Sequence, residues 1–459
     1  MHWKIFALLL ALLLILILLG VVVPWMQAQA AQSRGQFSEA SHLLEQVAER
    51  IPLPSLWEQA GLLAYRAQEY PHAVLLLENA RARGVLTLEG WDTLGLAYWQ
   101  DHQPDQALTR WHEALRRLGP SAQLFARLAL AYRHLEDWQN ERQALQEWVR
   151  LKSEEAYPHY RLGLLLLSQD LVQADAEFAL AALLDPRLGP AVEALRAALS
   201  QARQTPDETE RLLLLGRALG IVEEWKLALL LFEQAVSKAP ENGEAWAWLA
   251  EARQHTGQPL QDELERAHRL APRSPTVHLL IGLFAFRNGE NVRAIREFLQ
   301  AAELQPQESA IWVALGEAYA QQGDLSLAMA AYQRATQLTP ERAEVWRALA
   351  TFCATYGVQA QEIGLPAARQ AVSLQSGDAR NLDVLGWLLL LNGDLDSAER
   401  MLLQALDLQP DLPSVHLHLG MLYLDKGQNT QAESHLNEVI KLAPQSPLAE
   451  MARRVLGKP

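Results

Sequence analysis

The stretch WVALGEAYAQQGDLSLAMAAYQRATQLTP, residues 312–340, decides the fold of this 459-residue chain. Bulky and small residues alternate at helical spacing in both of its halves. A Gly-Asp pair at residues 323–324 separates the halves and is typical of a tight turn. The stretch therefore predicts two helices that fold back on each other. Its key positions are Trp312, Leu315, Gly316, Tyr319, Ala328, Tyr332, Ala335 and Pro340.

The same spacing recurs along most of the chain. The slot of Trp312 is also occupied by Trp57, Trp91, Phe125, His159, Leu212, Trp246, His278, Trp346, Leu382 and His416. This pattern resembles the tetratricopeptide repeat, a 34-residue helix–turn–helix unit that stacks into a solenoid. The resemblance implies an all-α, right-handed α-solenoid of about eleven repeats. Such an array needs no single large core, because each unit buries one face against the next.

The regular spacing breaks between His159 and Leu212, where an extra helix is expected over residues 190–205. We interpret this helix as the cap of a first array, and a degenerate repeat that continues the solenoid is the alternative. The predicted organisation is an N-terminal membrane anchor at 1–25, a link and half-repeat cap at 26–53, an N-terminal array at 54–206, a C-terminal array at 207–445 and a capping helix at 446–459.

The N-terminal run over residues 5–23 is uncharged and almost wholly apolar. As a helix it would be about 28 Å long, which is enough for one bilayer crossing. Trp3 and Trp25 flank the run, as aromatic residues do at membrane interfaces. These features predict an uncleaved single-pass anchor. The alternative is a cleaved signal peptide, since residues 28–30 (Ala-Gln-Ala) offer a small-x-small cleavage site.

The charges around this run predict its orientation. Lys4 precedes it, and the next charge along the chain is Arg34. The positive-inside bias then favours a cytoplasmic N-terminus and an extracytoplasmic array. An array in the cytoplasm is the alternative topology.

Composition and motifs argue against several classes of function. The formal net charge of −14 disfavours nucleic-acid binding, which needs a basic face. Cys353 is the only cysteine, so no intrachain disulfide or cysteine metal cluster can form, and its slot predicts a buried thiol. The sequence contains no metalloprotease, phosphate-loop or nucleophile-elbow motif. We therefore predict a non-enzymatic protein without a cofactor, a metal or a small-molecule ligand.

The resemblance implies that first helices line a concave groove with the second, fifth, ninth and twelfth residues of each repeat. The middle of the chain places polar residues there, among them Arg217, Glu251, Gln254 and Glu317. Towards the ends the row is apolar. The predicted protein-binding groove consists of Leu62, Tyr65, Leu96, Trp99, Leu130, Leu164, Leu167, Trp387, Leu390, Met421 and Leu424. The alternative is that these residues belong to the packed core.

An apolar groove predicts a helical or apolar segment of another protein as the partner. The functional hypothesis is a membrane-anchored scaffold that assembles or organises a membrane or envelope complex. Two alternatives are an integral structural subunit of a larger membrane complex and a regulatory partner of a separate polysaccharide- or lipid-processing enzyme. Fold alone does not distinguish these roles.

Overall fold

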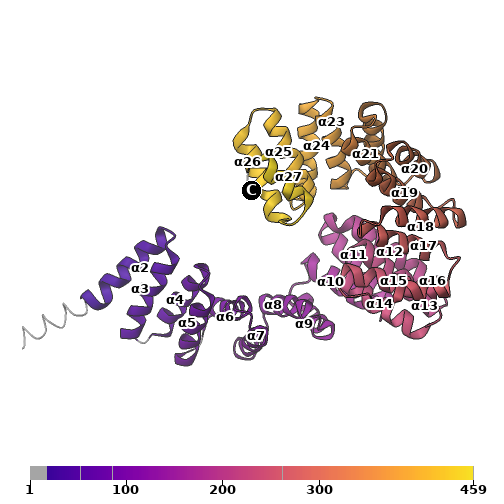
Figure 1. Cartoon of the computed structure of the whole chain (residues 1–459). Helices are drawn as coiled ribbons and strands as arrows, with labels where there is room; N and C mark the ends of the chain where they lie inside the picture. Colours follow the sequence, from indigo (N-terminus) through magenta and orange to yellow (C-terminus); the bar gives the residue numbers. More distant parts are fainter. Residues whose placement is uncertain (1–17, 52, 85, 261, 458–459) are drawn as a thin grey trace, which may run out of the picture. The chain divides into compact units, whose positions relative to one another are not determined.

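The computed structural model describes residues 18–51, 53–84, 86–260 and 262–457, and every regular element in these ranges is helical (Figure 1). The chain divides into two compact units, which are described separately here. The first consists of Met1–Leu166 and Val172–Leu184, and the second of Leu167–Leu171 and Asp185–Pro459.

The first unit contains five helix pairs. Its helices are α2 (Val23–Ser33), α3 (Phe37–Arg50), α4 (Pro54–Arg66), α5 (Tyr70–Arg83), α6 (Leu88–Gln100), α7 (Pro104–Leu118), α8 (Ala122–His134), α9 (Trp138–Leu151), α10 (Ala156–Leu166) and α11 (Leu171–Leu184). A five-residue π-helical turn, η1 (Leu18–Val22), precedes α2. The pairs from α4–α5 to α10–α11 correspond to the four repeats predicted before the break in spacing.

The second unit begins with a single helix and continues with seven helix pairs and a final helix. Its helices are α12 (Gly189–Gln204), α13 (Glu208–Ile221), α14 (Trp225–Lys238), α15 (Gly243–His255), α16 (Glu263–Leu270), α17 (Pro275–Arg287), α18 (Asn291–Leu304), α19 (Ser309–Gln322), α20 (Leu325–Leu338), α21 (Ala343–Tyr356), α22 (Leu365–Leu374), α23 (Ala379–Leu391), α24 (Leu395–Leu408), α25 (Pro413–Asp425), α26 (Asn429–Leu442) and α27 (Pro447–Val455). Short turns precede α12 (η2, Pro186–Leu188) and α22 (η3, Ala360–Gly364).

Contacts within each unit follow the order of the chain. The two helices of a pair pack against each other, as α4 does with α5 and α17 with α18, and several first helices also touch the first helix of the next pair, as α13 does with α15 and α19 with α21. This nearest-neighbour pattern is the mark of a solenoid. The all-α repeat architecture predicted from the sequence is therefore confirmed, including eleven helix pairs at the predicted positions.

Helices of one pair approach closely because the first helix carries a glycine where the second carries a large side chain. In the α17–α18 pair, Phe298 is fully buried between Ala294 and Ala301. A Cβ atom at Gly282 would lie 2.4 Å from Cε1 of Phe298. Gly316 and Tyr332 repeat the arrangement in α19–α20, where that separation would be 2.8 Å. The small–large pattern in the sequence thus encodes the distance between the helices.

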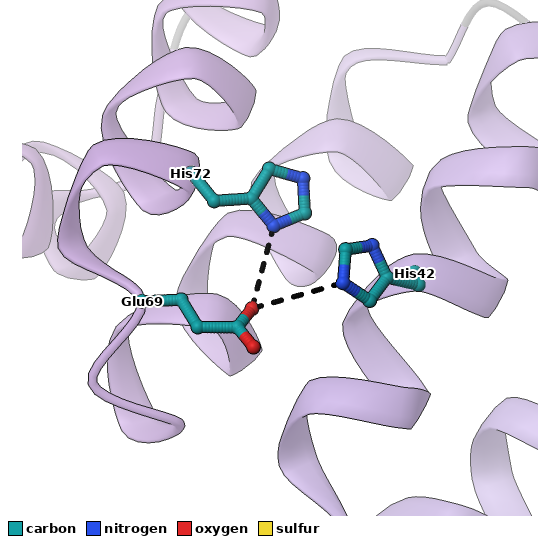
Figure 2. A group of neighbouring side chains, drawn as sticks. All are labelled: His42, Glu69 and His72. Atoms are coloured by element: carbon teal, nitrogen blue, oxygen red, sulfur yellow. Dashed lines mark hydrogen bonds and ion pairs between the residues drawn. The ribbon is translucent and has the colours of Figure 1, made fainter.

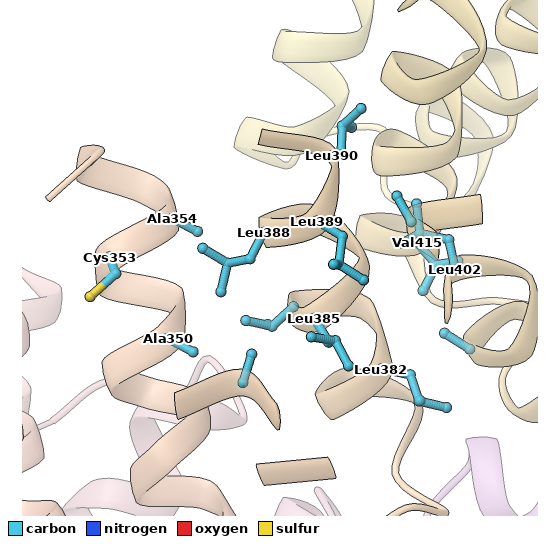
Figure 3. Close-up of a cluster of buried hydrophobic side chains, with 14 of the residues drawn as sticks. Ala350, Cys353, Ala354, Leu382, Leu385, Leu388, Leu389, Leu390, Leu402 and Val415 are labelled. Atoms are coloured by element: carbon cyan, nitrogen blue, oxygen red, sulfur yellow. The ribbon is translucent and has the colours of Figure 1, made fainter. Parts of the chain in front are cut away.

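A continuous apolar core joins α21 to α26 in the second unit (Figure 3). Leu382, Leu388 and Leu402 contribute to it, and Cys353 is fully buried within it. Burial raises the pKa of the Cys353 thiol to about 11, so the thiol stays protonated near neutral pH. The prediction of a buried cysteine is confirmed.

The N-terminal boundary differs from the prediction. The range 26–53 was predicted to begin with a link, but its first residues belong to α2 (Val23–Ser33), which packs against α3. Pro24, Ala28 and Ala31 are its buried residues. The sequence of α2 contains the small residues that the first helix of a repeat needs. Because the apolar run directly precedes α2, the start of this repeat could not be recognised from the sequence. The predicted half-repeat is therefore a complete helix pair.

The extra helix lies where the sequence predicted it, over Gly189–Gln204 rather than 190–205. It was interpreted as the cap of the first array, but α12 belongs to the second unit and packs against α13. Val192, Leu195 and Leu199 are buried. These residues form an apolar stripe at i, i+3 and i+7 spacing. Such a stripe can cap the first or the last repeat of an array, so the sequence pattern alone does not say which array the helix belongs to.

No helix within residues 18–457 is long and apolar enough to cross a membrane. The predicted span at 5–23 lies mostly in residues 1–17, outside the described part of the chain.

We expect Gly282→Ala to destabilise the second unit by about 1–3 kcal/mol, because the added methyl group overpacks the contact with Phe298. Gly189→Ala is the matched control. A Cβ atom at Gly189 meets no atom within 4 Å, so this variant should match or slightly exceed wild-type stability. Urea denaturation followed by circular dichroism measures both. Equal midpoints for the two variants would contradict the packing argument.

Candidate functional site

The eleven residues predicted to line an apolar groove fall into three groups. Two are exposed, Leu130 and Leu424. Six are partly buried: Leu62, Tyr65, Leu96, Trp99, Trp387 and Met421. Three are buried: Leu164, Leu167 and Leu390. The predicted set therefore combines open surface with packed interior.

Polar pairs interrupt the apolar row on first helices. In the first unit, Arg127 of α8 donates two hydrogen bonds to Asp92 of α6, at 2.8 and 3.1 Å. In the second unit, Nδ1 of His418 lies 2.7 Å from Oδ1 of Asp383, and the His418 ring stacks on Trp387. The two residues of each pair are 35 positions apart in the sequence, so each pair joins one repeat to the next.

The first helices α17, α19 and α21 enclose a pocket of about 550 Å³ in the second unit. Each of these helices contacts the next one. The pocket is lined by Phe286, Ser309, Ala310, Val313, Glu317, Ala320, Gln321, Tyr332, Arg342, Glu344, Val345, Arg347, Ala348, Thr351, Phe352, Thr355 and Tyr356. Eight of these 17 residues occupy the concave slots of their repeats. The pocket is large enough for one or two side chains of a bound segment.

Aromatic residues form part of the pocket lining. Tyr332 and Phe352 are buried with their ring centroids 5.1 Å apart, and the Phe352 ring lies 5.5 Å from that of Tyr356. Tyr356 is exposed and is therefore accessible to a ligand. Burial raises the pKa of Tyr332 well above its usual range, so its hydroxyl stays protonated at physiological pH. These rings offer apolar contact area and a neutral hydrogen-bonding group.

Glu317 is the unusual charge in this pocket. It has no hydrogen bond or ion pair among the residues that the structure describes. Its side chain reaches solvent, but the surrounding pocket removes enough water to raise the pKa of the carboxyl group. The hydroxyl of Ser309, a buried lining residue, also has no hydrogen-bond partner in the described residues. Polar groups that have no hydrogen-bond partner among the described residues mark a place where a ligand group can bind.

Glu251 holds the same ninth slot two repeats earlier and behaves in the opposite way. Burial alone would raise its pKa, but His255 and Arg287 lower it. Arg287 donates a hydrogen bond of 2.9 Å to Oε1 of Glu251 and another of 3.0 Å to the side chain of Gln254. Glu251 is thus neutralised within the protein. Glu317 lacks such a partner among the described residues.

The two arginines of the pocket are already paired. Arg347 donates hydrogen bonds to Asp378 and Asn381, at 3.1 and 2.9 Å. Burial lowers the pKa of Arg347, and the nearby charge of Arg380 adds to this effect. Arg342 donates a hydrogen bond of 2.7 Å to Glu344 at the pocket edge. The carboxylate of Glu317 is therefore the charge in the pocket that a ligand can neutralise.

The concave slots contribute eight residues to this pocket, whereas the predicted groove residues lie towards the ends of the chain. Glu317 was noted as polar, yet its isolation could not be read from the sequence. Beside Glu317, the same slots on α19 and α21 give Ala310, Val313, Ala320, Glu344, Arg347 and Thr351, which line the pocket, and Ala354, which is buried and does not line it. Only the structure shows that Glu317 pairs with neither Arg342 nor Arg347 among the described residues of the pocket.

Two family models match the chain. One, described as the C-terminal domain of cilia and flagella-associated protein 70, matches residues 258–454, and a tetratricopeptide repeat model matches residues 93–156. The chain is a tetratricopeptide repeat protein. The matched ranges cover parts of both units, including the entire pocket. No curated protein matches the chain in a sequence search.

Several solved structures are similar to this tetratricopeptide repeat protein at low sequence identity. The APC/C hetero-tetramer Cut9–Hcn1 is 16% identical with a TM-score of 0.47, over 94% of this chain and 95% of that one. Yeast Tom70 is 15% identical with a TM-score of 0.42, over 95% and 94%. YrrB, titled a TPR protein with an unusual peptide-binding site, is 20% identical with a TM-score of 0.31, over 42% and 97%.

Two leucines in adjacent repeats allow a buried position to be compared with an exposed one. Leu390 and Leu424 occupy the same twelfth slot, but Leu390 is 6% exposed and Leu424 is 39% exposed. We expect Leu390→Asp to destabilise the second unit by at least about 3 kcal/mol, because it buries an unpaired charge. Leu424→Asp should change stability by less than about 1 kcal/mol. Urea denaturation tests this, and comparable losses would place both leucines in the core.

Proposed function

We propose that this tetratricopeptide repeat protein is a non-enzymatic scaffold that binds an extended segment of a partner protein in the pocket of α17, α19 and α21. The observation that carries the proposal is the carboxylate of Glu317, which lies among apolar and aromatic residues without a cationic partner in the described chain. The ligand that fits is a mainly apolar segment with one lysine or arginine.

The energetics favour this ligand. A basic side chain would donate a charge-assisted hydrogen bond to Glu317, worth roughly 1.5–3 kcal/mol. Its aliphatic stem and apolar neighbours would cover Val313, Phe352 and Tyr356. Binding would also offset the desolvation that raises the pKa of Glu317. The proposed ligand is therefore the apolar segment predicted from the sequence, with one basic residue as an added requirement.

Peptide display against the full chain tests the ligand class. We expect wild-type protein to enrich apolar peptides with a lysine or arginine at one position. Glu317→Gln should abolish this basic preference and weaken the selected peptides about tenfold or more. Glu344→Gln is the control, since Glu344 lies in the same pocket but is already paired with Arg342. An unchanged basic preference in Glu317→Gln would overturn the proposal.

The pH dependence of the selected peptides gives a second readout of the same interaction. A cationic side chain binds the ionised form of Glu317, and the raised pKa means that this form is lost at a higher pH than for an ordinary glutamate. Affinity should therefore fall as the pH is lowered through the raised pKa. The Glu317→Gln variant should show no such loss over that window.

We also propose that residues 5–23 anchor the protein in a membrane, with the N-terminus in the cytoplasm and the repeats on the extracytoplasmic side. The apolar sequence of this run supports the proposal. Trp25 and Met26, which follow the run in α2, are large apolar side chains that are 45% and 60% exposed. Such residues suit a position at the membrane interface.

Protease accessibility tests the anchor and its orientation. In spheroplasts or intact cells that carry a C-terminally tagged chain, the tag should sediment with membranes and be digested from outside. A variant that lacks residues 1–23 should lose the sedimentation. If the tag is protected until the cells are lysed, the repeats are cytoplasmic. If the full chain stays in the supernatant, the anchor proposal is wrong.

A further inference from the structure

Two imidazoles and a carboxylate converge near the N-terminal end of the first unit (Figure 2). His42 lies on α3, Glu69 immediately precedes α5, and His72 lies in the first turn of α5. Oε2 of Glu69 lies 3.9 Å from Nε2 of His42 and 3.5 Å from Nδ1 of His72. Candidate ligand atoms of the three residues all lie within 4.8 Å of one another.

These separations are close to those of a metal site. Zinc bonds of about 2.0–2.1 Å to nitrogen and oxygen place tetrahedral ligand atoms about 3.3 Å apart. The distances from Glu69 to the two rings are slightly longer than this. The His42 side chain is 54% exposed, so a small rotation can bring its Nε2 atom inward without disturbing the core.

Two further residues hold the cluster from outside. Nε2 of His72 lies 3.0 Å from Oε2 of Glu45, and Nδ1 of His42 lies 3.6 Å from the same oxygen. Glu45 therefore faces the ring nitrogens that point away from Glu69. Ser38 donates a hydrogen bond of 2.6 Å to Oε1 of Glu69, which leaves Oε2 directed at the rings. Histidine ligands of metals are held in this way by a carboxylate on the other ring nitrogen.

Charge also favours a divalent cation. The His42 and His72 rings are stacked, with centroids 4.7 Å apart and an interplanar angle of 24°. Glu45 and Glu69 place two carboxylates beside the ring nitrogens, at 3.0 Å for Glu45 and His72 and 3.9 Å for Glu69 and His42, which favours a bound cation. One divalent ion bound to both rings and to Glu69 balances these charges and keeps the rings neutral.

We propose that His42, Glu69 and His72 bind a divalent transition-metal ion, with Zn²⁺ as the ion that best suits the ligand set. Imidazole nitrogens with one carboxylate favour zinc-like ions over Mg²⁺ and Ca²⁺, which prefer oxygen ligands. Water completes the coordination. Glu45 and Ser38 are positioning residues. The ion links α3 to α5 and therefore links the α2–α3 pair to the α4–α5 pair. This inference is independent of the proposed peptide pocket.

Equilibrium dialysis of the full chain in detergent micelles against Zn²⁺ tests the proposal. We expect wild-type protein to bind one Zn²⁺ that His42→Gln and His72→Gln each weaken at least tenfold. Glu45→Gln should weaken it between about tenfold and a hundredfold, as loss of an outer-shell partner does. His134→Gln is the control, because His134 is exposed in the same unit and lies outside the cluster. Equal binding by wild type and both histidine variants would overturn the site.

A second measurement does not depend on the variants. Wild-type protein loaded with one equivalent of Co²⁺ should show the intense visible absorption of tetrahedral coordination, and Zn²⁺ but not Mg²⁺ should abolish it. Zn²⁺ should also raise the thermal midpoint of wild-type protein and leave that of His72→Gln unchanged. Weak octahedral bands, or displacement by Mg²⁺, would mean that the cluster is only a network of ion pairs.

Discussion

The close approach of two helices across a glycine is the constraint on which this fold depends. Gly282 lets Phe298 pack directly against α17, and Gly316 does the same for Tyr332 against α19. Because the contact fixes the spacing within each pair, it also fixes how the next pair stacks. The architecture is therefore the sum of many short-range contacts, and no single core has to hold the chain together.

The same stacking creates the concave pocket. First helices lie side by side, so their second, fifth, ninth and twelfth residues form rows across neighbouring repeats. Where a row supplies its own counter-charge, as Arg287 does for Glu251, the surface is neutralised internally. Where the described chain supplies none, as at Glu317, the partly solvent-exposed carboxylate favours a ligand that brings a positive charge.

The His42–Glu69–His72 cluster is built from different helices of the repeat than the pocket. Its residues come from α3 and from the start of α5, which are both second helices, whereas the pocket is built mainly from first helices. A repeat protein can therefore separate ligand recognition from stabilisation of its end. The α2–α3 pair packs on α4 through α3, so an ion that joins α3 to α5 would add a second link between these two pairs.

The sequence by itself determined the helix pairs, their order, the break before α12 and the burial of Cys353, because local spacing and side-chain size encode contacts between adjacent helices. It also named the slots that line the pocket. Tertiary structure decided which of these slots are open, since Leu390 and Leu424 share a slot but differ in exposure. It also decided that Glu317 lacks a partner within the described residues and that His42 meets His72, because both facts depend on contacts between repeats that sequence periodicity does not specify.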